Sequence, residues 1–148
     1  MSDLLNSIQN DLKQAMKDRD SLKVQTLRML TAAVKQFQID QQKDADDATV
    51  IGILTKMIKQ RQDSAKAFIE GNRPELAEKE DKEIEILKPY LPEQMSDAEI
   101  DAAIAAAISQ TGAAAMADMG KVMGVLTPKL KGRADMGKVS GIVRGKLG

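Results

Sequence analysis

The segment PYLPEQMSDAE, residues 89–99, decides how this chain is divided. Its two prolines stand three positions apart, and neither is compatible with the interior of an α-helix. Directly after them, Ser96 and Glu99 have the spacing of a capping box, which starts a helix by satisfying two free backbone amides. One helix must therefore end before this segment, and a new one begins after Ser96. We expect an N-terminal helical domain, residues 1–92, and a smaller C-terminal domain, residues 93–148.

Both parts have the apolar spacing of helices. Apolar side chains recur every three or four residues, and no stretch of strand length alternates between apolar and polar residues. Asp20 is placed to cap one helix, Pro74 suits the first turn of another, and Gly71 and Gly112 suit helix ends. The sequence predicts an all-α fold, in which an N-terminal helical bundle or hairpin part is joined by a proline-containing linker to the smaller C-terminal helical part.

The C-terminal part contains a repeat. The segment ADMGKVMGVL, residues 117–126, recurs as ADMGKVSGIV, residues 134–143. Each copy has the pattern of a helix with an aspartate as its N-cap and apolar residues at helical spacing. Pro128 follows the first copy, so we expect a kink or an early end of that helix.

The composition removes many kinds of chemistry. The 148 residues include no cysteine, histidine or tryptophan, one tyrosine and two phenylalanines. A zinc site of the usual nitrogen and sulfur type is excluded, as is catalysis by Ser-His-Asp or Cys-His groups. The few aromatic residues cannot build a stacking platform for single-stranded nucleic acid. We expect no metal site, no cofactor and no catalytic residue.

The charge is distributed unevenly along the chain. Lysine plus arginine and aspartate plus glutamate number 22 each, so the formal net charge is zero. Residues 1–111 contain 15 basic and 20 acidic residues, whereas residues 112–148 contain 7 basic and 2 acidic residues. The acidic helix expected after Pro74 pairs Glu78 with Lys82 at i,i+4 spacing, which is typical of a solvated helix face. The basic tail favours contact with a polyanion.

Glycines at helical spacing accompany this basic tail. Each weakens its helix by about 1 kcal/mol relative to alanine, which indicates close approach of the backbone to another helix or to a ligand. Helix packing is the favoured explanation, and phosphate binding is the alternative. The lysines have a corresponding simpler interpretation as a solvated surface. The candidate RNA-binding residues are Lys121, Lys129, Lys131, Arg133, Lys138, Gly120 and Gly137.

Two other signals bear on function. Residues 132–138, GRADMGK, match the spacing of a phosphate-binding P-loop as far as its lysine, but Val139 stands where magnesium binding needs serine or threonine. No apolar run is long enough to span a membrane, and the first residues lack the pattern of a signal peptide. These observations predict neither nucleotide binding nor membrane association, and together with the absence of cysteine they favour the cytoplasm.

Several segments carry a family resemblance. They are YLPEQMS (residues 90–96), ADMGKVMG (117–124), KGRAD (131–135), LRM (27–29) and KQRQDS (59–64). With these segments the chain resembles, over essentially its whole length, the YqeY family, also called GatB/YqeY. A departure is the second copy of the motif at residues 136–138, where more variable residues are expected.

The resemblance implies a function. The family is similar to the C-terminal tail domain of the GatB subunit of aspartyl/glutamyl-tRNA amidotransferase, and its label is carbon–nitrogen ligase with glutamine as amido-N-donor. In that enzyme the kinase centre lies in a separate domain and the glutaminase centre in another subunit, and neither fits in this chain. The implied role is to grip tRNA, so we expect a protein that binds tRNA or another RNA without an active site of its own.

Two rival interpretations stay open. In the first, the chain is a protein–protein adaptor whose helices recruit a tRNA-modifying, amidotransferase-type or other enzyme. In the second, it is a true transferase that uses carboxylates and lysines. Retention of tRNA that depends on salt would favour RNA binding over the adaptor, and activity of this chain alone with glutamine would favour the transferase.

Overall fold

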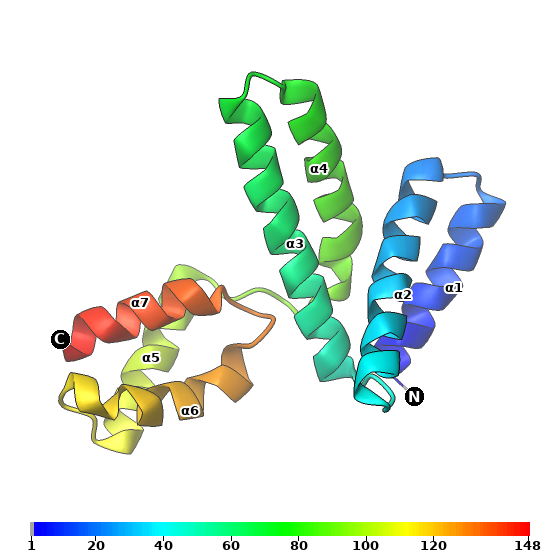
Figure 1. Cartoon of the computed structure of the whole chain (residues 1–148). Coiled ribbons are helices and arrows are strands. Elements are labelled where there is room, and N and C mark those ends of the chain that lie inside the picture. Colours follow the sequence, from blue (N-terminus) through cyan, green and yellow to red (C-terminus); the bar gives the residue numbers. More distant parts are fainter. Residues whose placement is uncertain (1) are drawn as a thin grey trace. The chain divides into compact units, whose positions relative to one another are not determined.

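The computed structural model describes residues 2–148 and confirms the all-α prediction (Figure 1). The described chain divides into two compact units, Met1–Leu91 and Pro92–Gly148. Across the described residues, backbone pairing of the β type is limited to one isolated bridge between Lys131 and Ala134. The α-helices are α1 (Asp3–Lys17), α2 (Ser21–Gln41), α3 (Asp47–Glu70), α4 (Pro74–Leu87), α5 (Asp97–Thr111), α6 (Met119–Leu130) and α7 (Met136–Leu147), with short 3-10 helices η1 (Lys88–Tyr90) and η2 (Met116–Asp118).

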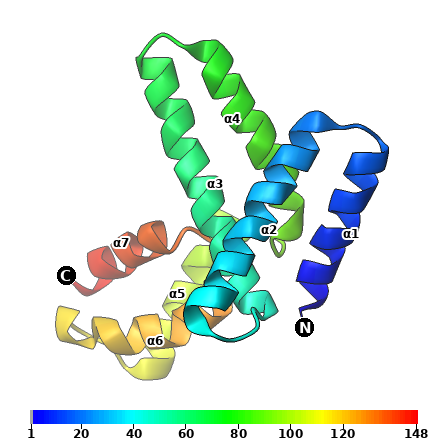
Figure 2. The ribbon, with the colours of Figure 1, turned by 45° about the vertical axis from the view of Figure 1, so that its right-hand side comes forward.

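The N-terminal unit consists of two helical hairpins, α1–α2 and α3–α4, which diverge toward their turns at residues 18–20 and 71–73 in both views (Figures 1 and 2). Local sequence sets the helix starts. The carboxylate of Asp20 accepts a hydrogen bond from the Lys23 amide, and that of Asp46 accepts one from the Thr49 amide. Pro74 stands in the first turn of α4, where its missing N–H removes no helical bond.

Leucine, isoleucine and valine side chains fill the core of this unit. Burying one such side chain stabilises a fold by about 1.5–3 kcal/mol, so burial of this cluster is the main favourable contribution to the packing of the two hairpins. Its members that are less than 2% exposed are Ile8, Leu27, Leu30, Val34, Val50, Leu54 and Leu87.

The proline-containing segment begins as part of the N-terminal unit. Helix α4 ends at Leu87, and η1 carries Tyr90 onto the core of that unit, whereas Pro89 is exposed. The Tyr90 hydroxyl donates a hydrogen bond of 2.6 Å to the carboxylate of Asp11 on α1, and Leu91 also packs against the core. The first half of this segment is therefore anchored by side-chain contacts.

The C-terminal unit is formed by α5, α6 and α7. The capping box at the start of α5 is confirmed, since Ser96 and Glu99 bond each other's backbone amides. Helix α5 ends at Gly112, whose φ of 66° lies in the left-handed region that favours glycine. The buried core residues are Ile100, Ile104, Ala107, Val122, Leu126, Leu130, Ala134, Val139, Val143 and Leu147.

The two copies of the repeat begin their helices differently. Asp135 caps α7 as predicted, because its carboxylate accepts hydrogen bonds from the amides of Gly137 and Lys138. The prediction is wrong for Asp118, which gives α6 no side-chain cap. Its carboxylate instead accepts hydrogen bonds from the amides of Ala114 and Ala115. The 3-10 helix η2 explains the difference. It ends at Asp118 itself, so the Asp118 carboxylate bonds the free amides just before η2 and not those of the first turn of α6.

Of the two outcomes expected at Pro128, a kink or an early end, the early end is wrong, since the helix continues to Leu130. Proline at this position removes one hydrogen bond, that to the carbonyl of Gly124 four residues earlier. Gly124 is exposed, so water can reach this carbonyl. The loss is small enough for the buried side chains of Leu126 and Leu130 to hold the last turn in place.

Over residues 2–148, no single helix is long and apolar enough to cross a membrane. Helix α5 and the segment Met116–Leu130 reach that composition only together, and they are bent by 97° at the break between them.

Candidate functional site

The predicted RNA-binding residues lie on α6, on α7 and on the turn between them. Lys121, Lys129, Lys131 and Lys138 are exposed, and Arg133 is half-buried. The turn brings the end of α6 and the start of α7 together, because Arg133 and Ala134 both donate backbone hydrogen bonds to the carbonyl of Leu130. The candidate cations therefore differ in accessibility and in the contacts that each one makes.

Two of these lysines are paired with carboxylates. The Lys138 ammonium lies 2.8 Å from the carboxylate of Asp97 on α5, and this hydrogen bond, with the charge of Asp97, raises the pKa of Lys138 above its ordinary value. The Lys121 ammonium lies 3.7 Å from the carboxylate of Asp118. Both lysines are solvent-exposed, and ion pairs at the surface contribute little to stability, so each lysine can still turn toward a ligand.

Arg133 has a structural contact. Its Nε donates a hydrogen bond of 3.0 Å to the backbone carbonyl of Glu93, and its own carbonyl accepts one of 2.9 Å from the amide of Met95. The side-chain amide of Gln94 donates to the carbonyl of Gly132, which has a φ of 80°. Residues 93–95 and the turn at 131–133 are thus joined by three hydrogen bonds. Two of the segments that carry the resemblance form a single structural feature.

Lys129 and Lys131 are the least engaged of the five candidates. Both are exposed, and no ion pair within residues 2–148 includes either of them. They stand at the last turn of α6 and directly after it. A phosphate could bind them without first displacing a carboxylate of the protein.

The glycines of α6 and α7 do not pack against other helices. A Cβ atom added at any of four of them would find no other atom within 4 Å, and one added at Gly137 would meet only the carboxylate of Asp135, at 3.3 Å. The favoured explanation from the sequence, close helix packing, is therefore wrong at these positions. The glycines with open space above them are Gly120, Gly124, Gly141 and Gly145.

Helical spacing groups these glycines into two stripes. Residues four apart lie on the same helix face, so α6 presents Gly120 with Gly124, and α7 presents Gly141 with Gly145. The faces opposite carry the buried valines and leucines. On both helices the exposed face is consequently poor in side chains, and cationic residues flank it.

The positive charge is local within the C-terminal unit. Residues 92–148 contain 7 basic and 6 acidic residues, a net charge of +1, because Glu93, Asp97, Glu99 and Asp101 lie before α5 or in its first turns. All seven basic residues belong to α6, α7 and the turn that joins them. Any attraction of this unit for a polyanion must come from that part of its surface.

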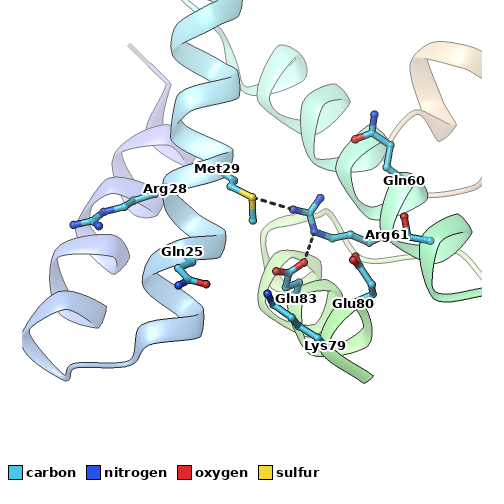
Figure 3. A pocket seen from close by; sticks show the side chains of 9 residues that line it. Gln25, Arg28, Met29, Gln60, Arg61, Lys79, Glu80 and Glu83 are labelled. Carbon is cyan, nitrogen blue, oxygen red and sulfur yellow. Dashed lines mark hydrogen bonds and ion pairs between the residues drawn. The ribbon is translucent and has the colours of Figure 1, made fainter. Parts of the chain in front are cut away.

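A groove in the N-terminal unit was not predicted from the sequence. It has a volume of about 610 Å³ and lies among α2, α3 and α4 (Figure 3). Near its centre, Arg61 and Glu83 form an ion pair of 3.1 Å, with side chains that are 12% and 8% exposed. The lining residues are Gln25, Arg28, Met29, Gln60, Arg61, Ser64, Lys79, Glu80 and Glu83.

The sequence contains a signal for this groove. Two of the segments that carry the resemblance, residues 27–29 and 59–64, supply five of its nine lining residues. The interpretation of the acidic helix as a solvated face is confirmed for the exposed pair Glu78–Lys82, at 3.3 Å. It is wrong for Glu83, which is buried.

Comparison with known proteins gives relatives in yeasts, each named "Altered inheritance of mitochondria protein 41, mitochondrial". The protein of Lachancea thermotolerans is 41% identical over 105 residues, covering 69% of this chain and 56% of the relative. That of Vanderwaltozyma polyspora is 41% identical, covering 57% and 46%, and that of Candida glabrata 36% identical, covering 62% and 52%. The matched segments span about half the length of these relatives.

These relatives contradict the predicted cytoplasmic location, because all three are named as mitochondrial proteins. The prediction rests on an absence of cysteine and of an export signal. Neither absence distinguishes the cytoplasm from another compartment that keeps thiols reduced, so the composition could not decide between them.

The resemblance seen in the motifs is confirmed over nearly the whole chain. The segments at residues 90–96, 117–124 and 131–135 all lie within residues 5–147, which match the model of the family described as "Yqey-like protein". This match covers both compact units. The chain belongs to the Yqey-like protein family.

Proposed function

We propose that the C-terminal unit binds RNA, with tRNA as the favoured ligand, through the exposed faces of α6 and α7 and the lysines beside the turn that joins them. The observation that carries this proposal is the placement of the glycines. Four of them stand on helix faces with nothing above them. They weaken the helices, and no packing requirement within the unit explains them.

A helix face that carries glycines is suited to phosphate recognition. It lets the sugar–phosphate backbone approach the peptide backbone closely, while neighbouring lysines supply the charge. Gly120 is followed directly by Lys121, and Gly145 lies between Arg144 and Lys146. The combination of bare helix face and flanking cation occurs on both helices, which favours a ligand that extends across them.

The contacts rank the candidate residues. Lys129 and Lys131 are the primary phosphate ligands, because they are exposed and outside the ion pairs described above. Lys121 and Lys138 are secondary ligands, which share their charge with Asp118 and Asp97. Arg133 acts mainly by holding the turn in shape through the carbonyl of Glu93.

The choice of tRNA among RNAs comes from the family resemblance, in which the tail domain of the amidotransferase grips the tRNA body. We propose binding without catalysis by this chain, since its composition supplies neither a Ser-His-Asp nor a Cys-His arrangement. We also propose that the two compact units are separately folding domains, which would leave the C-terminal unit free to bind RNA on its own surface.

The test is the binding of a labelled tRNA to the full chain and to the variant Lys129→Ala/Lys131→Ala over a range of salt concentrations. Loss of affinity and a shallower dependence on salt are expected for the variant. Unchanged binding would favour a role in which these lysines are only solvated.

A further inference from the structure

The groove of the N-terminal unit is separate from the surface proposed for RNA. We propose that it binds a segment of a partner protein, and that the ion pair of Arg61 and Glu83 recognises a carboxamide group, such as the side chain of glutamine or asparagine, on that segment. The RNA-binding proposal does not depend on this site, and this site does not depend on it.

The donor side of the site is the Arg61 guanidinium. Its Nε donates to Oε2 of Glu83 at 3.1 Å, and its Nη1 donates to the backbone carbonyl of Met57 at 3.2 Å. The partner of Nη2 is the sulfur of Met29, at 3.6 Å (Figure 3). A thioether is a weak acceptor, so a carbonyl oxygen from a ligand would replace it favourably.

The acceptor side is the second carboxylate oxygen of Glu83. Oε2 is bonded to Arg61, and no hydrogen bond within the described chain reaches Oε1. Among the described residues no buried side-chain oxygen or nitrogen lacks a partner, so solvent reaches Oε1, and Glu83 is one of the residues that line the groove. An N–H from a ligand could bond there without disturbing the ion pair.

A carboxamide matches this arrangement because it carries an acceptor and a donor side by side. Its carbonyl would accept from Nη2 of Arg61, and its NH₂ group would donate to Oε1 of Glu83. Hydrogen bonds to charged groups are stronger than those between neutral groups. A neutral ligand group also leaves the charge balance of the buried pair intact, which neither a carboxylate nor an ammonium group would do.

The rest of the groove favours a polypeptide over other occupants. Its charged lining residues are three cations and two anions, so it lacks the strong field that would attract a polyanion. The side chain of Met29 is exposed, lines the groove and points toward Arg61 (Figure 3), so it offers an adaptable apolar contact. Glu80 also lines the groove, and burial together with the charge of Glu83 raises the pKa of this carboxyl.

The experiment uses three small probes of similar size, namely propionamide, propionate and propylammonium, and a tripeptide with a central glutamine, acetyl-Leu-Gln-Ala-amide. Each is titrated into the isotopically labelled full chain, and the NMR signals of the Arg61 Nε–H and of the Gln60 and Ser64 amides are followed. The variant is Arg61→Met/Glu83→Leu, which removes donor and acceptor together. Replacing both partners of a buried pair by apolar residues usually preserves the fold.

Propionamide is expected to bind at least about tenfold more tightly than the two charged probes, and the tripeptide more tightly still. The shifts of the Gln60 and Ser64 amides should be lost in the double variant, whose remaining spectrum should show the same fold. Tighter binding of a charged probe, equal shifts in the variant, or binding of propionamide but not of the tripeptide would each overturn the proposal. A response of these signals to tRNA in preference to the peptide would assign the groove to RNA instead.

Discussion

The Nε of Arg61 on α3 and the Oε2 of Glu83 on α4 lie 3.1 Å apart, with about nine-tenths of both side chains buried. The pair joins the two helices of one hairpin, and its guanidinium also reaches Met29 on α2. It therefore links both hairpins of the N-terminal unit. A buried pair of this kind has an asymmetric energetic effect, because removal of one partner leaves the other as an uncompensated charge.

For this reason, Arg61→Met alone is predicted to lower the free energy of unfolding of the N-terminal unit by about 3 kcal/mol. The double variant Arg61→Met/Glu83→Leu should lie much closer to the wild type, because the uncompensated carboxylate is gone. Urea unfolding followed by circular dichroism measures both. Equal destabilisation by the single and double variants would show that packing, and not charge compensation, sets the cost.

The exposed glycines predict a gain of stability on substitution. Gly124→Ala and Gly141→Ala should each raise the free energy of unfolding of the C-terminal unit by about 0.5–1 kcal/mol, since an added Cβ meets nothing. Gly132→Ala is the matched control. Its φ of 80° is unfavourable for alanine, so it should lower stability by about 1 kcal/mol or more.

The same alanine variants also bear on function. If ligand backbone approaches these helix faces, Gly124→Ala and Gly141→Ala should weaken tRNA binding although they stabilise the fold. Binding measured by fluorescence anisotropy, at a temperature where every variant is folded, separates the two effects. Alanine variants that are more stable and bind tRNA as well as the wild type would contradict the proposal that the RNA backbone approaches these helix faces.

Tyr90 is a built-in reporter, because it is the only tyrosine and the chain has no tryptophan. Burial, followed by the hydrogen bond to Asp11, raises the pKa of its hydroxyl above the ordinary value. The protonated hydroxyl is thus favoured in the folded state. Its contribution to stability is complete below the unfolded pKa of about 10 and is lost as the pH rises through the folded pKa.

Two results are expected for this residue. Phenolate absorbance should appear only at a pH well above 10 in the folded chain, and near 10 in urea. Tyr90→Phe should lower the free energy of unfolding of the N-terminal unit by about 1–2 kcal/mol, because it removes a hydrogen bond to a carboxylate. Phenolate formation near pH 10 in the folded chain would show that Tyr90 is not docked on Asp11.

The proposed division into separately folding domains predicts a single preferred site of proteolysis. Leu91 packs on the first core, and the carbonyl of Glu93 and the side chain of Gln94 are bonded to the turn at 131–133, so only a short stretch of backbone links the two anchored segments. A protease specific for glutamate should cleave first after Glu93, which is exposed and outside any helix. Both fragments should keep their helical spectra. First cleavage after Glu70, at the end of α3, would contradict this boundary.

The sequence was sufficient for features that depend on neighbouring residues. The capping box of Ser96 and Glu99, the cap at Asp20 and the helix end at Gly112 were all predictable, because each is completed by backbone groups a few positions away. The different behaviour of Asp118 and Asp135 was not. The residues that follow each aspartate are nearly identical, and the difference comes from the segment before Asp118, which forms a 3-10 helix.

Features that depend on distant contacts could not be predicted. The ion pair of Arg61 and Glu83 joins residues 22 positions apart, so the pattern of either helix alone cannot show which glutamate meets Arg61. The glycines show the opposite case. Their spacing was visible in the sequence, but whether they face a helix or open space required the structure.

The slope of the logarithm of tRNA affinity against the logarithm of salt concentration tests the central claim most directly. Each lost phosphate contact reduces this slope by about 0.7–0.9. The variant Lys129→Ala/Lys131→Ala is therefore predicted to bind more weakly, with a slope shallower by about 1.4–1.8. The control Lys13→Ala/Lys17→Ala, on exposed positions of α1, changes the net charge equally and should leave the slope nearly unchanged. Equal slopes and affinities for the wild type and both variants, all with intact helicity, would contradict RNA binding by this surface.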